Sequence, residues 1–255
     1  MMNRPVPQEK PPMCRMLAFA SQKPLDIAPF LAHLARLSAH GNLVERWEKR
    51  PGGNHPDGWG IAFRGTGETR LLRSGEPAAT DSGLAGIRGS ADWFLGHVRY
   101  ASDTATVNER NAHPFLVDGI ALGHNGTFRG RIGEEAGSRK VSDTLIFLER
   151  LAGAWKERTL AGLHGALERL LSDRGLVGNY SAANMLILSG ESLFALRNYR
   201  KDEGYYTLYL QAEAGRVTVA SEPLDDPPGW RLLDDGELVE LSPQAPRSMR
   251  IRLAP

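Results

Sequence analysis

The chain of 255 residues has a single cysteine, so it can form no internal disulfide, which is typical of proteins in reducing compartments. It has no apolar run close to the roughly 20 residues that cross a bilayer. The formal net charge of +1 gives no field that would gather nucleic acid or an anionic membrane. Residues 1–12 lack the apolar segment of a secretory signal. We therefore expect a cytoplasmic protein with no nucleic-acid or membrane partner.

Motifs for metal ions and nucleotides are also missing. No histidine lies in a His-Glu-x-x-His pattern, and one cysteine cannot build a cysteine-rich zinc site. No glycine-rich phosphate loop of the Gly-x-Gly-x-x-Gly or Walker type occurs. The sequence thus predicts no metal and no cofactor.

The composition, with 41% hydrophobic and 24% charged residues, is that of an ordinary globular protein. Hydrophobic periodicity predicts helices at 24–40, 142–152 and 157–173. It predicts strands at 16–21, 59–63, 69–73, 92–101, 119–123, 183–189, 192–199, 206–212, 216–221 and 237–241. Segregated runs of strands and helices indicate an α+β fold with antiparallel sheets. Because so many strands exceed a comfortable single sheet, we expect two sheets packed face to face with helices outside.

The N-terminal segment differs from the rest of the chain. Residues 1–13 are rich in proline and polar side chains, so we expect a disordered leader or a start codon placed too far upstream. No linker divides the remainder of the chain, and we expect residues 14–255 to form a single domain.

Cys14 follows a methionine and begins an apolar run. If Met13 is removed, this residue carries both a thiol and a free α-amine. An α-amine with an ordinary pKa of about 7.7–8.0 can accept the thiol proton near neutral pH. One residue would then supply nucleophile and base, as in enzymes with an N-terminal nucleophile. The alternative is a small buried core cysteine.

Four further stretches could carry chemistry, each with a structural alternative. The segment from Asp57 to Gly60 favours a turn but could shape a site. Arg99 suits a carboxylate ligand bidentately, or forms a structural ion pair. Asn125 and Gly126 could form an oxyanion hole, or only a hairpin turn. Asp143 could hold a substrate ammonium group, or belong to a helix cap with its neighbour Ser142.

Together these residues suit one substrate class. Cys14 attacks, Asn125 and the Gly126 amide hold an oxyanion, and Arg99 and Asp143 hold an α-carboxylate and an α-ammonium group. A molecule with both groups and a more distant acyl centre is an amino acid with a side-chain amide. Two loops expected at 41–56 and 129–140 would contact the group beyond the amide.

The set resembles the class II glutamine amidotransferases, which are N-terminal nucleophile hydrolases. The matching pieces occur in the family's order: Met13-Cys14, Asp57-Gly58-Trp59-Gly60, Gly96-His97-Val98-Arg99-Tyr100-Ala101-Ser102, Asn111-Ala112-His113-Pro114-Phe115, Gly123-His124-Asn125-Gly126 and Ser142-Asp143-Thr144. The resemblance implies a four-layer αββα sandwich of two mainly antiparallel sheets. It also implies that a γ-glutamyl amide is hydrolysed through a thioester on Cys14.

The resemblance assigns roles to individual residues. Asn125 and Gly126 would form the oxyanion hole, with the Cys14 amine as base. Arg99 would bind the substrate carboxylate, with Tyr100 and Ser102 near it, and Asp143 would bind the α-amine. His97 and His113 would have supporting roles only. The compact length is most similar to stand-alone members such as the ergothioneine-pathway γ-glutamyl amidohydrolase.

One departure is the stretch of thirteen residues before Cys14. An amide nitrogen is not basic, so we expect the uncut chain to be nearly inactive, with translation from Met13 or removal of a propeptide as the remedy. The partner expected is a small γ-glutamyl substrate. The alternatives are a glutaminase subunit that delivers ammonia to a separate synthase, and a binding module in which Cys14 stays blocked.

Overall fold

The structure is a computed structural model that describes residues 13–41, 53–65, 67–225 and 229–252. The expected leader at residues 1–13 lies outside these ranges except for Met13, and the expected loop at 41–56 is described only in part. In the described ranges no helix combines the length and the hydropathy needed to cross a membrane.

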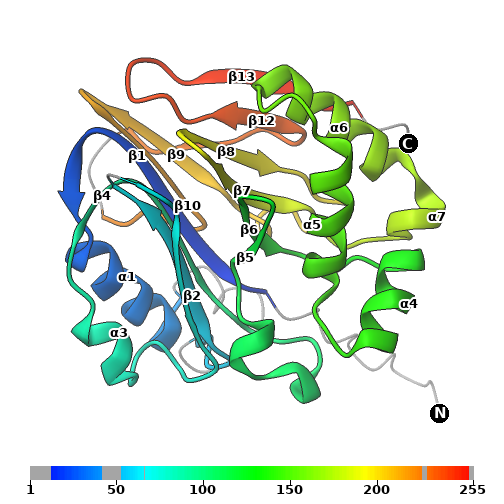
Figure 1. The fold of residues 1–255 in the computed structure, drawn as a ribbon, viewed down its shortest axis with the longest axis horizontal. Coiled ribbons are helices and arrows are strands. Elements are labelled where there is room, and N and C mark those ends of the chain that lie inside the picture. Colours follow the sequence, from blue (N-terminus) through cyan, green and yellow to red (C-terminus); the bar gives the residue numbers. More distant parts are fainter. Residues whose placement is uncertain (1–12, 42–52, 66, 226–228, 253–255) are drawn as a thin grey trace, which may run out of the picture.

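Two antiparallel sheets form the centre of the molecule (Figure 1). The seven-stranded sheet has the order β11-β9-β10-β1-β4-β2-β3 and the six-stranded sheet the order β13-β12-β8-β7-β6-β5. The first comprises β1 (Arg15–Asp26), β2 (Trp59–Arg64), β3 (Arg70–Ser74), β4 (Ser90–Val98), β9 (Tyr209–Glu213), β10 (Arg216–Ala220) and β11 (Arg231–Leu232). The second comprises β5 (Phe115–Val117), β6 (Ile120–Asn125), β7 (Asn184–Ser189), β8 (Ser192–Arg197), β12 (Glu237–Glu240) and β13 (Arg247–Arg250).

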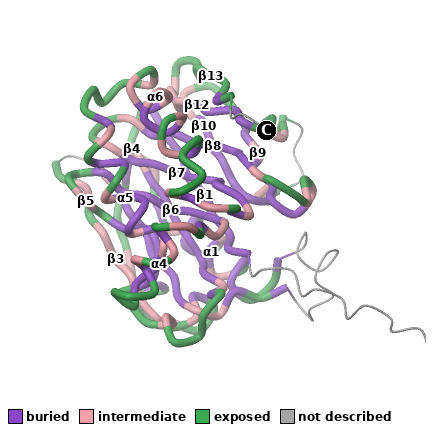
Figure 2. The backbone as a smooth tube through the Cα atoms, turned by 90° about the vertical axis from the view of Figure 1, so that its right-hand side faces the viewer, coloured by how far each residue is buried: buried purple, intermediate pink, exposed green. Residues whose placement is uncertain are grey.

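The alternation of side chains along β1 explains why the sheets stack. Met16 and Ala18 face the other sheet and pack in one cluster with Leu186 of β7. Phe19, on the opposite face of β1, packs in a second cluster beneath helix α1 (Ala28–Ala39). Residues 15–21 of β1 are therefore buried on both faces, and Figure 2 shows β1 among the buried strands at the centre.

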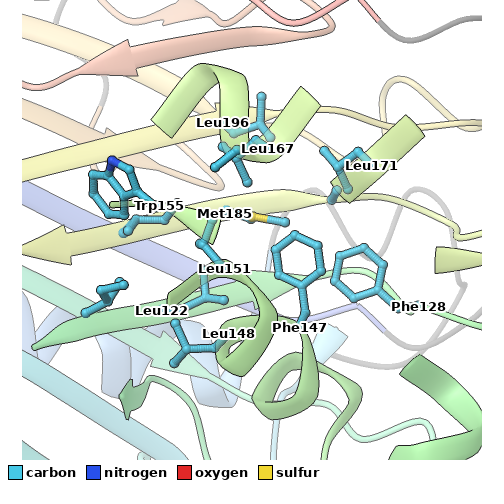
Figure 3. Packing of buried hydrophobic residues seen from close by; sticks show 14 of the residues in the cluster. Leu122, Phe128, Phe147, Leu148, Leu151, Trp155, Leu167, Leu171, Met185 and Leu196 are labelled. Atoms are coloured by element: carbon cyan, nitrogen blue, oxygen red, sulfur yellow. The ribbon is translucent and has the colours of Figure 1, made fainter. Parts of the chain in front are cut away.

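Helices cover both outer faces of the sheet pair (Figure 1). Helix α1 and the short α3 (Ser82–Gly86) lie on the seven-stranded sheet. The six-stranded sheet carries α4 (Gly130–Arg139), α5 (Asp143–Ala154), α6 (Leu160–Ser172) and α7 (Arg174–Val177). Figure 3 shows residues of α5 and α6 packed over strand residues Met185 and Leu196. Two 3-10 turns, η2 (Thr104–Thr106) and η3 (Glu109–Asn111), follow β4.

The predicted α+β fold, with two antiparallel sheets and outer helices, is confirmed. Several predicted boundaries and one predicted loop were wrong. The first helix begins at Ala28 rather than Pro24, because β1 resumes its pairing with β4 beyond an irregularity after Ala20. Strand β4 ends at Val98, so Arg99 lies beyond it. Residues 129–140, expected as a loop, contain α4, whose apolar side chains pack on the core despite its glycines.

Candidate active site

Cys14 lies where three strand ends meet. It directly precedes β1, and β1 pairs with β4 so that Arg15 is opposite Val98. The Cys14 backbone N–H donates to Asn125 Oδ1 at 3.1 Å, across to the last residue of β6 in the other sheet. The Cys14 thiol contacts the carbonyl oxygen of Tyr100 at 3.7 Å. The backbone N–H and the thiol of this buried residue thus each contact a polar group at the ends of the strands.

The thiol in this form of the chain is poorly ionised. Burial raises the pKa of the Cys14 thiol to about 11, although the charges of Arg99 and Arg15 act to lower it. Met13 is still attached, so the Cys14 nitrogen is an amide and cannot accept the thiol proton. A thiol with so high a pKa is not an effective nucleophile at neutral pH.

Asn125 has one side-chain atom engaged and one unpaired. Its Oδ1 accepts from Cys14, while its Nδ2 is buried and has no hydrogen-bond partner among the described residues. A buried donor without a partner is costly in a native protein and needs a reason. A transient negative oxygen next to Cys14 would satisfy it.

Gly126 is required by its surroundings. Its φ of +146° lies in the region that favours glycine, and a Cβ here would come within 1.9 Å of the Ala182 carbonyl oxygen. The predicted alternative of a two-residue hairpin turn at Asn125 and Gly126 is wrong, because β6 pairs with β5 and with the distant β7. The chain therefore leaves the sheet at this point and exposes backbone close to Cys14.

Arg99 is a buried cation without a carboxylate partner. Its side chain donates from Nη1 to the Thr106 carbonyl at 2.8 Å and from Nη2 to Thr106 Oγ1 at 2.7 Å. No carboxylate of the described residues lies within ion-pair distance of it, so the alternative of a structural ion pair does not hold there. Burial lowers the Arg99 pKa, opposed by the charges of Cys14, Asp57 and Asp143. The guanidinium thus lies near enough to Cys14, Asp57 and Asp143 for their charges to act on its pKa.

Asp57 fixes the chain that carries Arg99. Its backbone N–H donates to the Arg99 carbonyl at 3.0 Å, and Arg99 N–H donates to the Gly58 carbonyl at 2.9 Å. The Asp57 carboxylate accepts from the Ala101 N–H at 2.8 Å. These bonds continue the β2–β4 pairing beyond the strands, so Arg99 lies on a braced segment rather than on a free loop.

Asp143 begins α5, and its half-buried carboxylate is already engaged. Oδ2 accepts from the Phe128 N–H at 2.5 Å, and Oδ1 accepts from the Thr144 N–H at 2.8 Å. Ser142 is the N-cap residue, as its alternative interpretation predicted. The carboxylate thereby holds the segment that follows Gly126. Its negative charge also acts to raise the pKa of Arg99.

The other two predicted substrate-binding residues differ in their placement. Tyr100 contributes its backbone carbonyl to the contact with Cys14, and its side chain is half-buried. Ser102 is exposed and lies at the rim of the segment that carries Arg99.

Three buried histidines pack next to the strand ends that carry the site. The His97 and His113 rings stack with centroids 4.5 Å apart. His97 Nε2 donates to the His124 carbonyl at 3.1 Å, and His124 Nδ1 contacts Thr144 Oγ1 at 2.9 Å. Burial lowers the pKa of all three, that of His97 to about 3. They are therefore neutral at pH 7 and tie β4, β6 and α5 together.

Sequence reasoning missed the residues that position this site. Thr106 orients Arg99, and Ala182 accepts from His124 Nε2 at 3.2 Å while limiting residue 126 to glycine. Neither belongs to a recognisable motif, and only the tertiary fold brings them to the site. Among the described residues no group of histidine, cysteine and carboxylate side chains is arranged to bind a metal ion.

Comparison with known proteins finds a matching family model and several relatives. The family model for class II glutamine amidotransferases matches residues 13–210. An uncharacterised protein of Methanocaldococcus jannaschii is 30% identical over 188 residues, which are 66% of this chain and 50% of that protein. The gamma-glutamyl-hercynylcysteine sulfoxide hydrolase of Mycolicibacterium smegmatis is 28% identical over 236 residues, which are 90% of this chain and 96% of that protein.

A solved structure gives the same fold. The glutamine phosphoribosylpyrophosphate amidotransferase of B. subtilis superposes with a TM-score of 0.64 at 18% identity. The superposition covers 94% of this chain and 50% of that one. This chain therefore spans about half the length of that enzyme and of the Methanocaldococcus protein.

Proposed function

The chain belongs to the class II glutamine amidotransferases, and from that premise we propose that it hydrolyses a γ-glutamyl amide through a thioester on Cys14. The observation that carries the proposal is the convergence on one space of a cysteine, an unpaired amide donor and a buried arginine. Cys14 N–H reaches Asn125 Oδ1 at 3.1 Å, and the thiol lies 3.7 Å from the carbonyl next to Arg99. Asn125 Nδ2 has no partner among the described residues.

The first half of the reaction transfers the acyl group to sulfur. The free α-amine of Cys14 accepts the thiol proton, and the thiolate attacks the γ-carbonyl carbon. The negative oxygen that forms accepts hydrogen bonds from Asn125 Nδ2 and the Gly126 N–H. The C–N bond then breaks, the leaving nitrogen takes the proton from the α-ammonium group, and the amine departs.

The second half releases the acid. A water molecule gives a proton to the Cys14 α-amine and attacks the thioester carbonyl, again with the oxyanion held by Asn125 and Gly126. The C–S bond breaks, the sulfur recovers the proton from the α-ammonium group, and glutamate leaves. The enzyme returns to its starting state with no cofactor consumed.

The glutamyl half of the substrate is held at its α-carbon. Thr106 occupies two of the five N–H donors of Arg99, so other donors of the fork can bind the α-carboxylate. Asp143 attracts the α-ammonium group, and Tyr100 and Ser102 border the carboxylate end. This arrangement recognises a γ-glutamyl group and leaves the amine half to other residues.

The mechanism requires that the peptide bond between Met13 and Cys14 is absent from the active protein. With that bond intact there is no base, and the thiol pKa of about 11 keeps the sulfur protonated. Translation from Met13 followed by removal of the methionine, or cleavage of a longer leader, would each expose the amine. We favour the start at Met13.

A second candidate is a glutaminase subunit that supplies ammonia to a separate synthase. The observation that favours it is that this chain spans half of the B. subtilis amidotransferase that it superposes on. The stand-alone hydrolase is favoured by the 96% coverage of the Mycolicibacterium hydrolase. A non-catalytic module with a blocked Cys14 is the third alternative.

One assay separates these functions. The purified chain is incubated with glutamine and with several γ-glutamyl amides, and glutamate release is measured with a Cys14→Ala control. Turnover by the chain alone supports the hydrolase, and turnover only after a synthase is added supports the subunit. No turnover from a chain shown to begin at Cys14, with or without an added synthase, would refute both.

A further inference from the structure

Met13 has an unusual environment for a residue that the mechanism discards. It is fully buried and packs with Ala182, Tyr205 and Tyr206, with Tyr199 at the edge. We call these four surrounding residues the Met13 cluster. The rings of Tyr205 and Tyr206 are 5.0 Å apart and nearly perpendicular, so they form two walls of a corner. The corner encloses the buried side chain of Met13.

The backbone around the Met13 cluster is held by hydrogen bonds that do not depend on Met13. Behind it, the buried Arg197 donates to the carbonyls of Tyr206 at 2.9 Å, Glu203 at 2.8 Å and Leu233 at 2.7 Å. The Tyr205 N–H donates to the Asp202 carbonyl at 2.8 Å. These bonds hold the backbone of the tyrosine segment and do not involve residue 13. Loss of Met13 therefore leaves the backbone hydrogen bonds of the tyrosine segment in place.

The role of the α-amine explains why the Met13 cluster would lie next to the leaving group of the substrate. The leaving nitrogen must approach the Cys14 nitrogen to receive its proton. The carbonyl carbon of Met13 is bonded to that nitrogen, so residue 13 occupies space that the leaving group needs. Ala182 connects the two regions, because it belongs to the cluster and its carbonyl lies against Gly126.

The positive charge of Arg197 next to the Met13 cluster limits which substituents the cluster can bind. Arg197 is buried, its guanidinium lies 4.6 Å from the Tyr199 ring centroid, and no carboxylate of the described residues pairs with it. A fixed positive charge in this position disfavours a second cation nearby. A neutral apolar substituent meets no such penalty and gains from leaving water.

We infer that the Met13 cluster binds the amine half of the substrate, and that this half carries a neutral apolar substituent of about methionine length. The inference rests on the proposed function and names its substrate class: γ-glutamyl amides of apolar amines rather than glutamine itself. The amine departs from the cluster after the C–N bond breaks and its nitrogen has taken the proton from Cys14.

The test compares three substrates on protein whose N-terminal residue is shown by mass spectrometry to be Cys14. They are glutamine, γ-glutamyl-n-butylamide and γ-glutamyl-(3-aminopropyl)amide, of which the last replaces a terminal methyl group by ammonium. All three release glutamate, so one readout serves. We expect kcat/KM for the butylamide to exceed that of each of the others by at least about tenfold, as burial of a few methylene groups allows.

Variants locate the effect. Tyr206→Ala and Tyr205→Ala should each reduce the ratio of butylamide to glutamine kcat/KM by about fivefold or more, since they remove one wall. Tyr209→Ala, a truncation of a half-buried strand residue outside the cluster, is the matched control and should leave the ratio unchanged. If the tyrosine variants fail to fold, the comparison of the three substrates on the unaltered protein still tests the inference.

Equal kcat/KM for glutamine and the butylamide would overturn the inference while leaving the γ-glutamyl hydrolase intact. Preference for the aminopropyl amide would also overturn it. A ratio that does not change in folded Tyr205→Ala and Tyr206→Ala proteins would place the amine half elsewhere. Release of glutamate from none of the three would refute the proposed function as well.

Discussion

The two polar atoms of the Asn125 side chain have different proposed roles. Its Oδ1 accepts from the Cys14 nitrogen, and its Nδ2 is a buried donor that has no partner among the described residues. Asn125→Ala should lower kcat by about 10²–10³, because an oxyanion donor is lost, while KM changes little. Asn125→Asp keeps the acceptor for Cys14 and removes the donor, so it should lose a similar factor.

Asn184 provides the matched control for this prediction. It pairs directly with Asn125 across β6 and β7 and is also fully buried. Asn184→Ala should lower the melting temperature but change kcat of the folded protein only a few-fold. If Asn125→Ala behaves like Asn184→Ala in steady-state kinetics, the oxyanion assignment is wrong.

Arg99 is predicted to act on substrate capture. Arg99→Lys keeps the charge and loses the fork, so KM should rise about 10–100-fold, the loss of one or two charged hydrogen bonds, with kcat affected less. Initial-rate measurements over a range of substrate concentrations separate the two constants. An unchanged KM would exclude this residue as the carboxylate ligand.

The alkylation rate of the Cys14 thiol measures how strongly its surroundings suppress its ionisation. With Met13 attached, a pKa of about 11 leaves about one Cys14 thiol in 10⁴ ionised at pH 7. Alkylation by iodoacetamide should therefore be slow at pH 7 and accelerate about tenfold per pH unit up to pH 10. Fast alkylation at pH 7 by a chain with the intact Met13–Cys14 bond would show that burial does not suppress ionisation of this thiol.

For single residues, the sequence indicates candidate reacting groups more readily than the residues that position them. Cys14, Asn125 and Arg99 belong to short motifs whose chemistry can be deduced from residue type. Thr106 has no such signal, because its contact with Arg99 depends on how the chain turns after β4. The roles themselves stay predictions until the variants are measured.

Among the elements, the strand ends that hold the site are joined by neutral histidines. These rings connect β4, β6 and α5, and burial lowers the pKa of His97 to about 3 and of His113 well below its usual value. In the unfolded chain a histidine titrates near 6.5. As the pH falls below about 6.5, the unfolded state binds protons that the folded state does not, so stability decreases.

The predicted stability loss is steep. His97 alone should lower the free energy of unfolding by about 1.4 kcal/mol per pH unit between pH 6 and pH 4, since one proton separates the two states. Urea unfolding at several pH values measures this slope. A His97→Gln variant should show a shallower slope, and equal slopes in both proteins would show that another group controls the acid sensitivity.

Strands and helices with strong periodicity were predicted from the sequence, and weakly patterned ones were not. Helix α5 combines a serine N-cap with regular apolar spacing, and the structure confirms it. Helix α4 has several glycines and few apolar residues, so its helical state depends on packing against the core. Strand β11 has only two residues, and β13 contains a single apolar residue, Met249, so neither gives a pattern.

For the whole molecule, the two-sheet architecture was predictable because strand number and order restrict the solutions. Stacking the sheets brings the start of β1, the end of β4 and the end of β6 to one edge. That meeting point could not be derived from the sequence, because it depends on which strands are central in each sheet. The expectation that these strand ends form one site came from the resemblance to a family and not from periodicity.

The proposed mechanism makes the chain an enzyme only when residue 13 is detached. The direct measurement compares glutamate release from a γ-glutamyl amide by two preparations, each with its N-terminus determined by mass spectrometry. The form that begins at Cys14 should turn over, and the form with an intact Met13–Cys14 bond should be slower by about 10²–10⁴, the contribution of a general base. Equal turnover by the two forms would contradict this mechanism.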